Sequence, residues 1–351
     1  MKAKLNKKKV VVGISGGVDS AMCLKMLLTQ GFDVVAVYIK MCRYKGNMTV
    51  DIKSAQKVAK TLRVKLDIVD AGSLFCQKVV SYYDRQIRKG NTPSPCVLCN
   101  PEVKLATLSE YADKIGAFYI ATGHYATIKK DKSGCFRLEK AKDKTKDQTY
   151  SLCFLTQKLL SRMILPLGNI SKKEIIKMAQ NTKGLESLSQ RRQSQDFCYL
   201  REVDQLSYCK KRFPQNEGEI VDKLGKVIGY HNGIYPFTIG QRRGIGLSGG
   251  PYYVIRKDTK NNKIIVSKNE KDLYEKEVIL KPYNLIDTKI TDGIEVSAKL
   301  RSTQKLTSAR LYKKDNSLIL KFNRIERAVT AGQVAVFYKS NICLGGGIIN
   351  S

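Results

Sequence analysis

The stretch KVVVGISGGVDSAMCLKMLLTQG at residues 9–31 decides how the N-terminal part of the chain folds. Its β-branched run at residues 10–14 predicts a buried parallel strand, and residues 20–30 predict a helix that ends at Gly31. A strand that turns directly into a helix presents free N–H groups at the positive end of the helix dipole. Gly16 and Gly17 have no Cβ, so the backbone can approach an anion closely. The turn therefore predicts a phosphate site.

Two common phosphate-binding motifs do not describe this turn. The sequence has no Gly-x-x-x-x-Gly-Lys-Ser/Thr, so the turn is not a Walker loop. It also has no Gly-x-Gly-x-x-Gly here, so a dinucleotide-binding fold is not supported. Asp19 places a negative charge beside the expected phosphate, and we expect a metal ion or the turn itself to hold its carboxylate.

The pattern of the chain predicts three domains. Residues 1–205 alternate strands with helices, at residues 34–39, 51–62, 65–69, 74–88, 102–115 and 118–123, which predicts an α/β domain with a parallel sheet. Residues 206–275 contain short β-rich runs with a hairpin signal at residues 260–262, and predict a small mixed central domain. Residues 276–351 contain short strands and a second hairpin signal at residues 314–316, and predict a C-terminal antiparallel β-barrel.

The charge of the chain points to an anionic partner. It has 351 residues, with 63 Lys and Arg against 31 Asp and Glu, for a net charge of +32. Nucleic acid and acidic membrane surfaces are the two partners that such a balance favours. No apolar stretch is long enough to span a membrane, and the apolar run at residues 10–12 is too short for a signal peptide. We therefore expect a cytoplasmic protein.

Ten cysteines in such a protein do not predict a disulfide framework. Cys96 and Cys99 lie between Pro95 and Pro101, which predicts a loop just before a helix, where the dipole would favour the thiolate. The pair could be inert, half of a zinc site, or a sulfur-handling centre. The sequence has no second Cys-x-x-Cys and no nearby His pair, which argues against zinc. A sulfur centre fits best, with a further Cys such as Cys198 carrying a persulfide. An iron–sulfur cluster on three cysteines stays open as its variant.

Several motifs together resemble those of one family. The loop at residues 13–20 resembles the pyrophosphate loop of the N-type ATP pyrophosphatases, which have an adenine nucleotide alpha-hydrolase-like fold. With it come TPSPCVLCN at residues 92–100, ATGHY at residues 121–125, KDQ at residues 146–148, TIGQRRG at residues 238–244 and AGQVAVFY at residues 331–338. In combination they resemble the tRNA-specific 2-thiouridylases over nearly the whole chain.

This resemblance implies an activity. Members of the family replace the C2 oxygen of the wobble uridine, position 34 of tRNA, with sulfur. The resemblance implies that ATP with Mg²⁺ adenylates the C2 oxygen and that a cysteine persulfide then supplies the sulfur. It implies binding to the tRNA anticodon arm, and a sulfur donor such as a cysteine desulfurase or a sulfur-relay protein. The alternatives are an ATP-dependent amidating ligase with the same loop and a non-catalytic RNA-binding protein.

The resemblance also implies roles for individual residues. The catalytic thiols are Cys99, the nucleophile that meets the base, and Cys198, the persulfide carrier, which would form a disulfide with Cys99. The residues expected to bind ATP are Gly13, Ile14, Ser15, Gly16, Gly17, Val18, Asp19, Ser20, Ile39 and Gly123. The residues expected to contact tRNA are Ser94, Pro95, Cys96, His124, Lys146, Asp147, Gln148, Arg301, Ser302 and Gln333. Cys96 stands where many members have Asp, and it makes a Cys96–Cys99 disulfide or a [4Fe-4S] cluster on Cys96, Cys99 and Cys198 conceivable.

Overall fold

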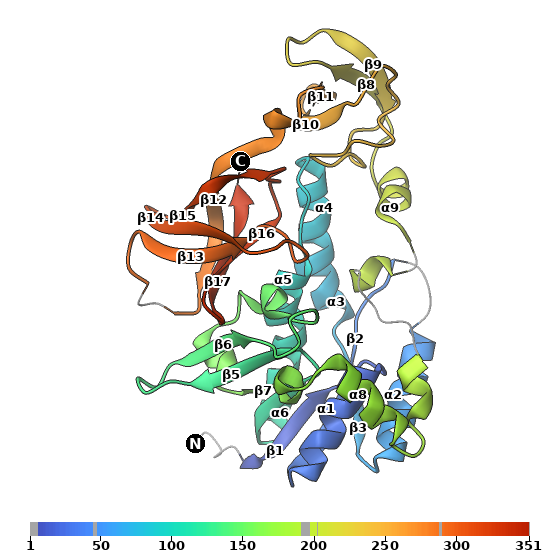
Figure 1. The fold of residues 1–351 in the computed structure, drawn as a ribbon. Coiled ribbons are helices and arrows are strands. Elements are labelled where there is room, and N and C mark those ends of the chain that lie inside the picture. Colours follow the sequence, from blue (N-terminus) through green and yellow to red (C-terminus); the bar gives the residue numbers. More distant parts are fainter. Residues whose placement is uncertain (1–5, 45–47, 191–196, 202, 288–289, 351) are drawn as a thin grey trace.

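The computed structural model describes residues 6–44, 48–190, 197–201, 203–287 and 290–350. Figure 1 shows three parts: an α/β part at the bottom, a β-barrel beside its upper half, and a small sheet at the top. The three-part fold class expected from the sequence is confirmed, including the parallel sheet and the antiparallel barrel.

The α/β part is built on a five-stranded sheet in the order β3-β2-β1-β4-β7, with every pair parallel. The strands are β1 Asn6–Gly13, β2 Asp33–Lys40, β3 Leu66–Asp70, β4 Ala117–Thr122 and β7 Met163–Ile164. Along β1, Val11 packs into the core on one face, and Val10 and Val12 pack into the core on the other. Both faces are covered, so the β-branched run is apolar throughout instead of alternating.

Helices cover the two faces of this sheet. The helices α1 Val18–Thr29, α2 Thr49–Thr61 and α8 Lys172–Gln180 pack on one face, and α6 Leu105–Lys114 packs on the other. The helix expected at residues 74–88 is present as α3 Gly72–Phe75, a π-helical turn Cys76–Val80 and α4 Ser81–Arg88. Shorter helices complete this part: α7 Gln157–Leu160 and the single turns Thr149–Leu152, Pro166–Asn169, Glu186–Gln190 and Cys198–Leu200. The helix α9 Gln205–Arg212 follows and leads to the small sheet.

The expected loop at Cys96 and Cys99 is wrong, because these residues form a helical turn. This turn, α5 Cys96–Cys99, runs through a π-helical turn Asn100–Lys104 directly into α6. Pro95 precedes the turn, and its carbonyl accepts a hydrogen bond from the Cys99 N–H at 3.0 Å. Pro101 lacks an N–H, and the chain accommodates it in the wider π turn without breaking the helix.

The small sheet has the order β10-β11-β8-β9. Its strands are β8 Glu217–Val221, β9 Val227–Asn232, β10 Tyr253–Asp258 and β11 Lys263–Ser267. The expected hairpin at residues 260–262 joins β10 to β11, with Asn262 in the left-handed conformation at φ 52°. The same sheet contacts the end of α4, because a Cβ on Gly90 would lie 3.0 Å from Thr259.

The C-terminal part is a closed antiparallel barrel, as expected. Its strands are β12 Tyr274–Leu285, β13 Ile294–Lys299, β14 Thr307–Lys314, β15 Ser317–Arg327, β16 Val334–Lys339 and β17 Ile342–Asn350, preceded by the turn Glu270–Leu273. The long strand β12 pairs with both β15 and β17 and so closes the sheet. The hairpin expected at residues 314–316 joins β14 to β15, with Asp315 at φ 46°.

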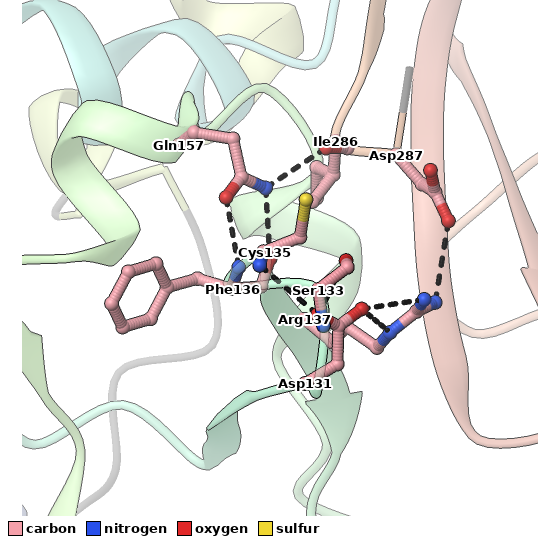
Figure 2. Close-up of polar contacts among 8 residues, drawn as sticks. All are labelled: Asp131, Ser133, Cys135, Phe136, Arg137, Gln157, Ile286 and Asp287. Carbon is pink, nitrogen blue, oxygen red and sulfur yellow. Dashed lines mark hydrogen bonds and ion pairs between the residues drawn. The ribbon is translucent and has the colours of Figure 1, made fainter. Parts of the chain in front are cut away.

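One hairpin was not expected from the sequence. Strands β5 Ala126–Lys130 and β6 Phe136–Lys140 leave the α/β part and extend the sheet of the barrel through pairing of β6 with β17. Figure 2 shows the polar contacts that hold them there. The Gln157 amide bonds the Phe136 N–H and carbonyl and also donates to the Ile286 carbonyl at 2.9 Å, and Arg137 pairs with Asp287 at 3.2 Å. These contacts fix the barrel against the α/β part.

We predict that Gln157→Leu weakens this junction. The change leaves one N–H and two carbonyls without their hydrogen bonds, so the unfolding free energy should fall by about 1–3 kcal/mol. Urea denaturation followed by circular dichroism measures this loss. Lys158→Ala, at the exposed neighbouring position, is the matched control. Equal stability of the two variants would show that the Gln157 contacts do not hold the parts together.

Candidate functional site

The phosphate turn lies at the carboxyl end of β1 and leads into α1. Gly16 has φ +77°, and a Cβ there would lie 2.7 Å from the Asp51 carbonyl oxygen and 2.9 Å from the Ser54 Cβ. Only glycine fits this conformation and this space. The Ser54 hydroxyl donates to the Gly16 carbonyl at 2.8 Å, so α2 holds the turn from behind. Gly17 is the N-cap of α1, where the first backbone N–H groups of the helix have no partner inside it.

The two serines of the turn play different parts. Ser20 is buried, and its hydroxyl accepts from the Ser15 N–H at 3.1 Å and donates to the Gly17 carbonyl at 3.0 Å. Ser20 thus fixes the shape of the turn, whereas Ser15 is exposed. The side chains of Ile14 and Val18 are buried in the core below, so they can offer only backbone groups to a ligand.

Asp19 is held by two partners from distant parts of the chain. Its Oδ1 accepts from the Tyr125 hydroxyl at 2.7 Å and pairs with the buried Lys172 Nζ at 2.5 Å. Burial, and then the carboxylate, raise the pKa of Tyr125, which therefore keeps its proton. The positive charge of Lys172 compensates the negative charge of Asp19 beside the expected phosphate. Lys172 was not expected from the sequence, because nothing local marks a residue so far along the chain as a partner of the turn.

The other residues expected to bind ATP come to the same edge of the sheet. Gly123 follows β4, and a Cβ there would lie 2.8 Å from the Asp19 carbonyl carbon and 2.9 Å from the Ser20 nitrogen. Ile39 lies near the end of β2, which is the neighbour of β1, and packs against the core. Ligands of parallel α/β sheets bind outside the carboxyl ends of the strands, which is where these residues gather.

The two expected catalytic thiols lie in one apolar cluster. Cys99 is only 3% exposed and packs with Phe75 and Val103, and the partly exposed Cys198 packs against the same cluster. Phe197, next to Cys198, also joins it. Cys99 and Cys198 are about a hundred positions apart in the sequence, and the fold brings them together.

Burial, rather than the helix dipole, controls these thiols. Burial and the two neighbouring thiols raise the pKa of Cys99 to about 12, while Lys104 opposes the rise. Burial also raises the pKa of Cys96, again against Lys104. The net pKa shift of both thiols is upward, opposite in direction to the shift expected at a helix N-terminus. The cause is the apolar surroundings, which penalise a charged sulfur.

Lys104 is the cation of this site and was missed in the sequence. It lies in the π-helical turn after Cys99 and is partly buried. Burial alone would lower the pKa of its ammonium, but Cys99, Cys198 and Cys96 outweigh that effect and the pKa is raised. An ammonium that keeps its proton here is the group best placed to stabilise a thiolate.

His124 connects the thiols to the phosphate turn. Its Nδ1 lies 2.7 Å from the Thr122 hydroxyl, and it directly follows Gly123, which packs on the turn. Burial, and then Lys104, lower the pKa of His124 to about 3. The imidazole is neutral at physiological pH, so it can donate or accept a hydrogen bond but cannot attract a phosphate by charge. Lys104 acts electrostatically on both His124 and the thiols, so the end of β4 and the thiol cluster lie near each other.

Several residues expected to contact tRNA meet where the α/β part touches the barrel. The Thr92 N–H donates to the Ala331 carbonyl at 2.9 Å, which brings the segment of Ser94 and Pro95 to the barrel loop that carries Gln333. The Tyr150 hydroxyl donates to the Val334 carbonyl at 2.8 Å.

The barrel end beside this contact is basic. The Arg301 guanidinium donates to the Ala328 carbonyl at 2.6 Å, and burial lowers its pKa. The neighbouring Ser302 is exposed, and its carbonyl accepts from Lys299. The ammonium of Lys299 lies 5.4 Å from the centre of the Tyr150 ring, a cation–π distance.

Two of the expected tRNA contacts use their side chains inside the protein. Asp147 accepts from the Ala141 N–H at 3.1 Å and from the Thr149 hydroxyl at 2.7 Å. Gln148 accepts from the Tyr125 N–H at 2.8 Å. These bonds hold the loop that carries Lys146 and position Tyr125 near Asp19. The motif at residues 146–148 therefore stabilises the fold of the protein itself, whether or not it also contacts RNA.

The donors for a metal ion do not converge. Across the described residues, no group of three or more His, Cys, Asp and Glu side chains is arranged to hold a metal. Cys96, Cys99 and Cys198 thus do not fit an iron–sulfur cluster in this arrangement, and no step below uses one. Among the helices of the described segments, none has the length and apolar character needed to cross a membrane.

Comparisons with known proteins cover the whole chain. The family model described as the tRNA methyl transferase HUP domain matches residues 8–202. The tRNA methyl transferase PRC-barrel domain matches residues 207–268, and the aminomethyltransferase beta-barrel domain matches residues 275–349. Among solved structures, the U34-tRNA thiolase NcsA from Methanococcus maripaludis with its [4Fe-4S] cluster is 19% identical, with a TM-score of 0.35, covering 56% of this chain and 62% of that one.

Curated relatives are much closer. The tRNA-specific 2-thiouridylase MnmA 2 of a Thermoanaerobacter species is 38% identical over 97% of this chain and 97% of its own. The tRNA-specific 2-thiouridylase MnmA of Treponema denticola is 38% identical over 98% of both chains, and that of Clostridioides difficile is 36% identical over 97% of this chain and 98% of its own. With matches of this extent, the chain belongs to the tRNA-specific 2-thiouridylase family.

Proposed function

We propose that the protein is an ATP-dependent sulfurtransferase that converts C2 of the wobble uridine 34 in tRNA to the 2-thio form. What supports this proposal is that the phosphate turn and the Cys99/Cys198 pair both lie near Gly123, His124 and Lys104. An amidating ligase needs the phosphate turn but has no use for the two thiols. A non-catalytic RNA-binding protein needs neither. Membership of the family favours the thiouridylase over both.

In the first half of the proposed reaction, the phosphate turn would bind ATP for the adenylation of the C2 oxygen. The C2 carbonyl of uracil is a poor electrophile, and its oxygen is a poor leaving group. The N–H groups at the start of α1 and the exposed Ser15 would bind the ATP phosphates while the C2 oxygen attacks the α-phosphorus. Pyrophosphate leaves, and the C2 oxygen becomes part of an AMP leaving group. Mg²⁺ belongs to this proposal, because a divalent cation neutralises the charge that develops on the phosphates. Asp19 is already bonded to Lys172 and Tyr125, so the cation would be held by the phosphates of ATP themselves.

The second half belongs to the thiols. A persulfide on Cys198 attacks C2 through its terminal sulfur, and AMP leaves with the former C2 oxygen. Cys99 as thiolate then attacks Cys198 Sγ, which breaks the persulfide S–S bond, forms a Cys99–Cys198 disulfide and leaves the sulfur on C2. An external thiol reduces this disulfide before the next turnover. Cys99 must lose its proton against its raised pKa, and the charge of Lys104 favours that loss.

The remaining elements of the proposal concern partners and placement. The wobble base is stacked in the anticodon loop, so C2 becomes accessible only when the base is flipped out. Ser94, Pro95, Cys96, Arg301, Ser302 and Gln333 are proposed to receive the anticodon arm, and the +32 charge would supply salt-dependent affinity for phosphates. A cysteine desulfurase or a sulfur-relay protein is proposed as the donor. We also propose a cytoplasmic location and domain limits at residues 205 and 275.

The proposal is tested by thiolation in vitro. Purified protein, ATP with Mg²⁺, a cysteine desulfurase with L-cysteine as the persulfide donor, and unmodified tRNA should give 2-thiouridine, measured by mass spectrometry of digested tRNA. Cys99→Ser and Cys198→Ser should each lower the yield at least about 100-fold, because each removes one partner of the sulfur transfer.

Cys135→Ser is the matched control, since Cys135 is half-buried at the distant junction of Figure 2 and should leave the yield unchanged. Full activity of the Cys99 and Cys198 variants would refute the sulfur-transfer half of the proposal. Pyrophosphate release with a small carboxylate in the absence of tRNA would favour the amidating ligase instead.

A second prediction concerns Lys104 and pH. Lys104 lowers the pKa of Cys99, so Lys104→Gln should move the alkaline rise in thiolation rate to higher pH. A displacement of one pH unit corresponds to about a 10-fold lower rate on the rising limb. Lys104→Arg keeps the charge and should restore most of the profile. If Lys104→Gln and wild type rise at the same pH, the ammonium does not assist Cys99.

A further inference from the structure

A second pair of cysteines lies in the same region but outside every motif discussed above. Cys42 follows the end of β2, and Cys76 is the first residue of the π-helical turn between α3 and α4. The Cys76 S–H donates to the Cys42 Sγ, and the two sulfurs are 2.9 Å apart although the residues are separated by 34 positions. The Cys42 S–H in turn donates to the Gly72 carbonyl at 3.3 Å. The two thiols form a short hydrogen-bonded chain.

The fold leaves room for this pair and holds it in place. A Cβ on Gly72 would lie 3.3 Å from the Cys42 Sγ, so any side chain there would crowd the sulfur. Both cysteines pack against the apolar cluster that contains Phe75 and Cys99. Both are also partly exposed, so a small reagent can reach them from solvent. A disulfide bond is about 2.05 Å long, so the two sulfurs need only a small movement to bond.

The hydrogen bonds give the two thiols unequal roles. Burial, and then Cys42, raise the pKa of Cys76 to about 11, so Cys76 keeps its proton and offers it to its neighbour. Cys42 is the sulfur that accepts this hydrogen bond, and it is therefore the one to react first. Cys76 lies in contact with Cys42 and can therefore form the disulfide bond with it in the second step. A reactive thiol beside a resolving thiol is the arrangement of redox-sensitive cysteine pairs.

We propose that Cys42 and Cys76 are a redox-active dithiol, separate from Cys99 and Cys198, which closes to a reversible disulfide when it meets a low-molecular-weight disulfide. Cys42 attacks one sulfur of the reagent, forms a mixed disulfide and releases one thiol. Cys76 then attacks Cys42 Sγ, which forms the Cys42–Cys76 bond and releases the second thiol. Two protein thiols are oxidised, and one reagent disulfide is reduced to two thiols. This inference does not depend on the proposed function.

Closure would bond the end of β2 to the helix that lines the cluster of Cys99. Ile39, three residues before Cys42, and Phe75, next to Cys76, both belong to the cluster that contains Cys99. A covalent bond between Cys42 and Cys76 would restrain this cluster. Closing a loop of this length restricts the unfolded chain, so we expect the oxidised form to melt a few degrees higher than the reduced form.

The test uses the wild-type chain, because trypsin separates the relevant cysteines. Cys42 lies on the peptide of residues 41–43, Cys76 on residues 66–78, Cys96 and Cys99 on residues 90–104, and Cys198 on residues 193–201. Reduced protein is incubated with oxidised glutathione, the remaining thiols are alkylated, and the peptides are identified by mass spectrometry. We expect residues 41–43 linked to residues 66–78, with a mass two hydrogens below the sum of the two peptides, and recovery of both free thiols with dithiothreitol.

Two variants define the order of attack. Cys76→Ser should accumulate glutathione on Cys42, and Cys42→Ser should leave Cys76 as a free thiol at the same glutathione concentration. Cys135→Ser should form the linked peptide as the wild type does. Alkylation of both Cys42 and Cys76 throughout the titration would overturn the proposal. A bond from either of them to Cys96, Cys99 or Cys198 would overturn it as well.

Discussion

The site depends on one close approach between two strand ends. The backbone of Gly123, after β4, lies so close to Asp19 and Ser20 that a Cβ would come within 3.0 Å of three of their atoms. This contact places His124 beside the phosphate turn, and through Lys104 it connects the turn to Cys96, Cys99 and Cys198. A side chain at position 123 would push the phosphate turn away from His124. The parallel sheet supplies the framework, but the absence of a side chain at position 123 is what lets the phosphate turn pack close to His124.

Burial protects the Cys99 thiol from oxidants, and it also suppresses the thiolate that the proposed reaction requires. The apolar cluster around Phe75 and Val103 raises the pKa of Cys99, so the resting protein does not expose a thiolate to oxidants. In the proposed reaction Cys99 must become a thiolate, and among the described residues the ammonium of Lys104 compensates part of that cost. The partly exposed Cys42 and Cys76 stand in the same wall and meet solvent more readily. The chain thus places a second, more accessible thiol pair beside a buried one.

Most of the fold could be predicted from the sequence, because the residue patterns that indicate strands, helices and turns are local. Continuous β-branched runs marked the buried strands, and turn residues such as Asn262 and Asp315 marked the hairpins. The turn at Gly16 was recognisable from the sequence because glycines, which have no Cβ, let the backbone approach an anion closely. The helical turn at Cys96–Cys99 was missed because prolines on both sides argue for a loop, and only the π turn reconciles Pro101 with a helix. Partners across long separations had no local signal: the pairing of β6 with β17, Lys172 beside Asp19, and Cys76 beside Cys42.

The central claim is that the phosphate turn and the thiols serve one reaction at one base. The most direct measurement follows an oxygen atom. tRNA carrying ¹⁸O at C2 of uridine 34 is thiolated in a single turnover with unlabelled ATP, and the released AMP is analysed by mass spectrometry. The account predicts one ¹⁸O in AMP for each 2-thiouridine formed, because the C2 oxygen leaves with the adenylate. Unlabelled AMP, with the ¹⁸O in water or in pyrophosphate, would contradict it.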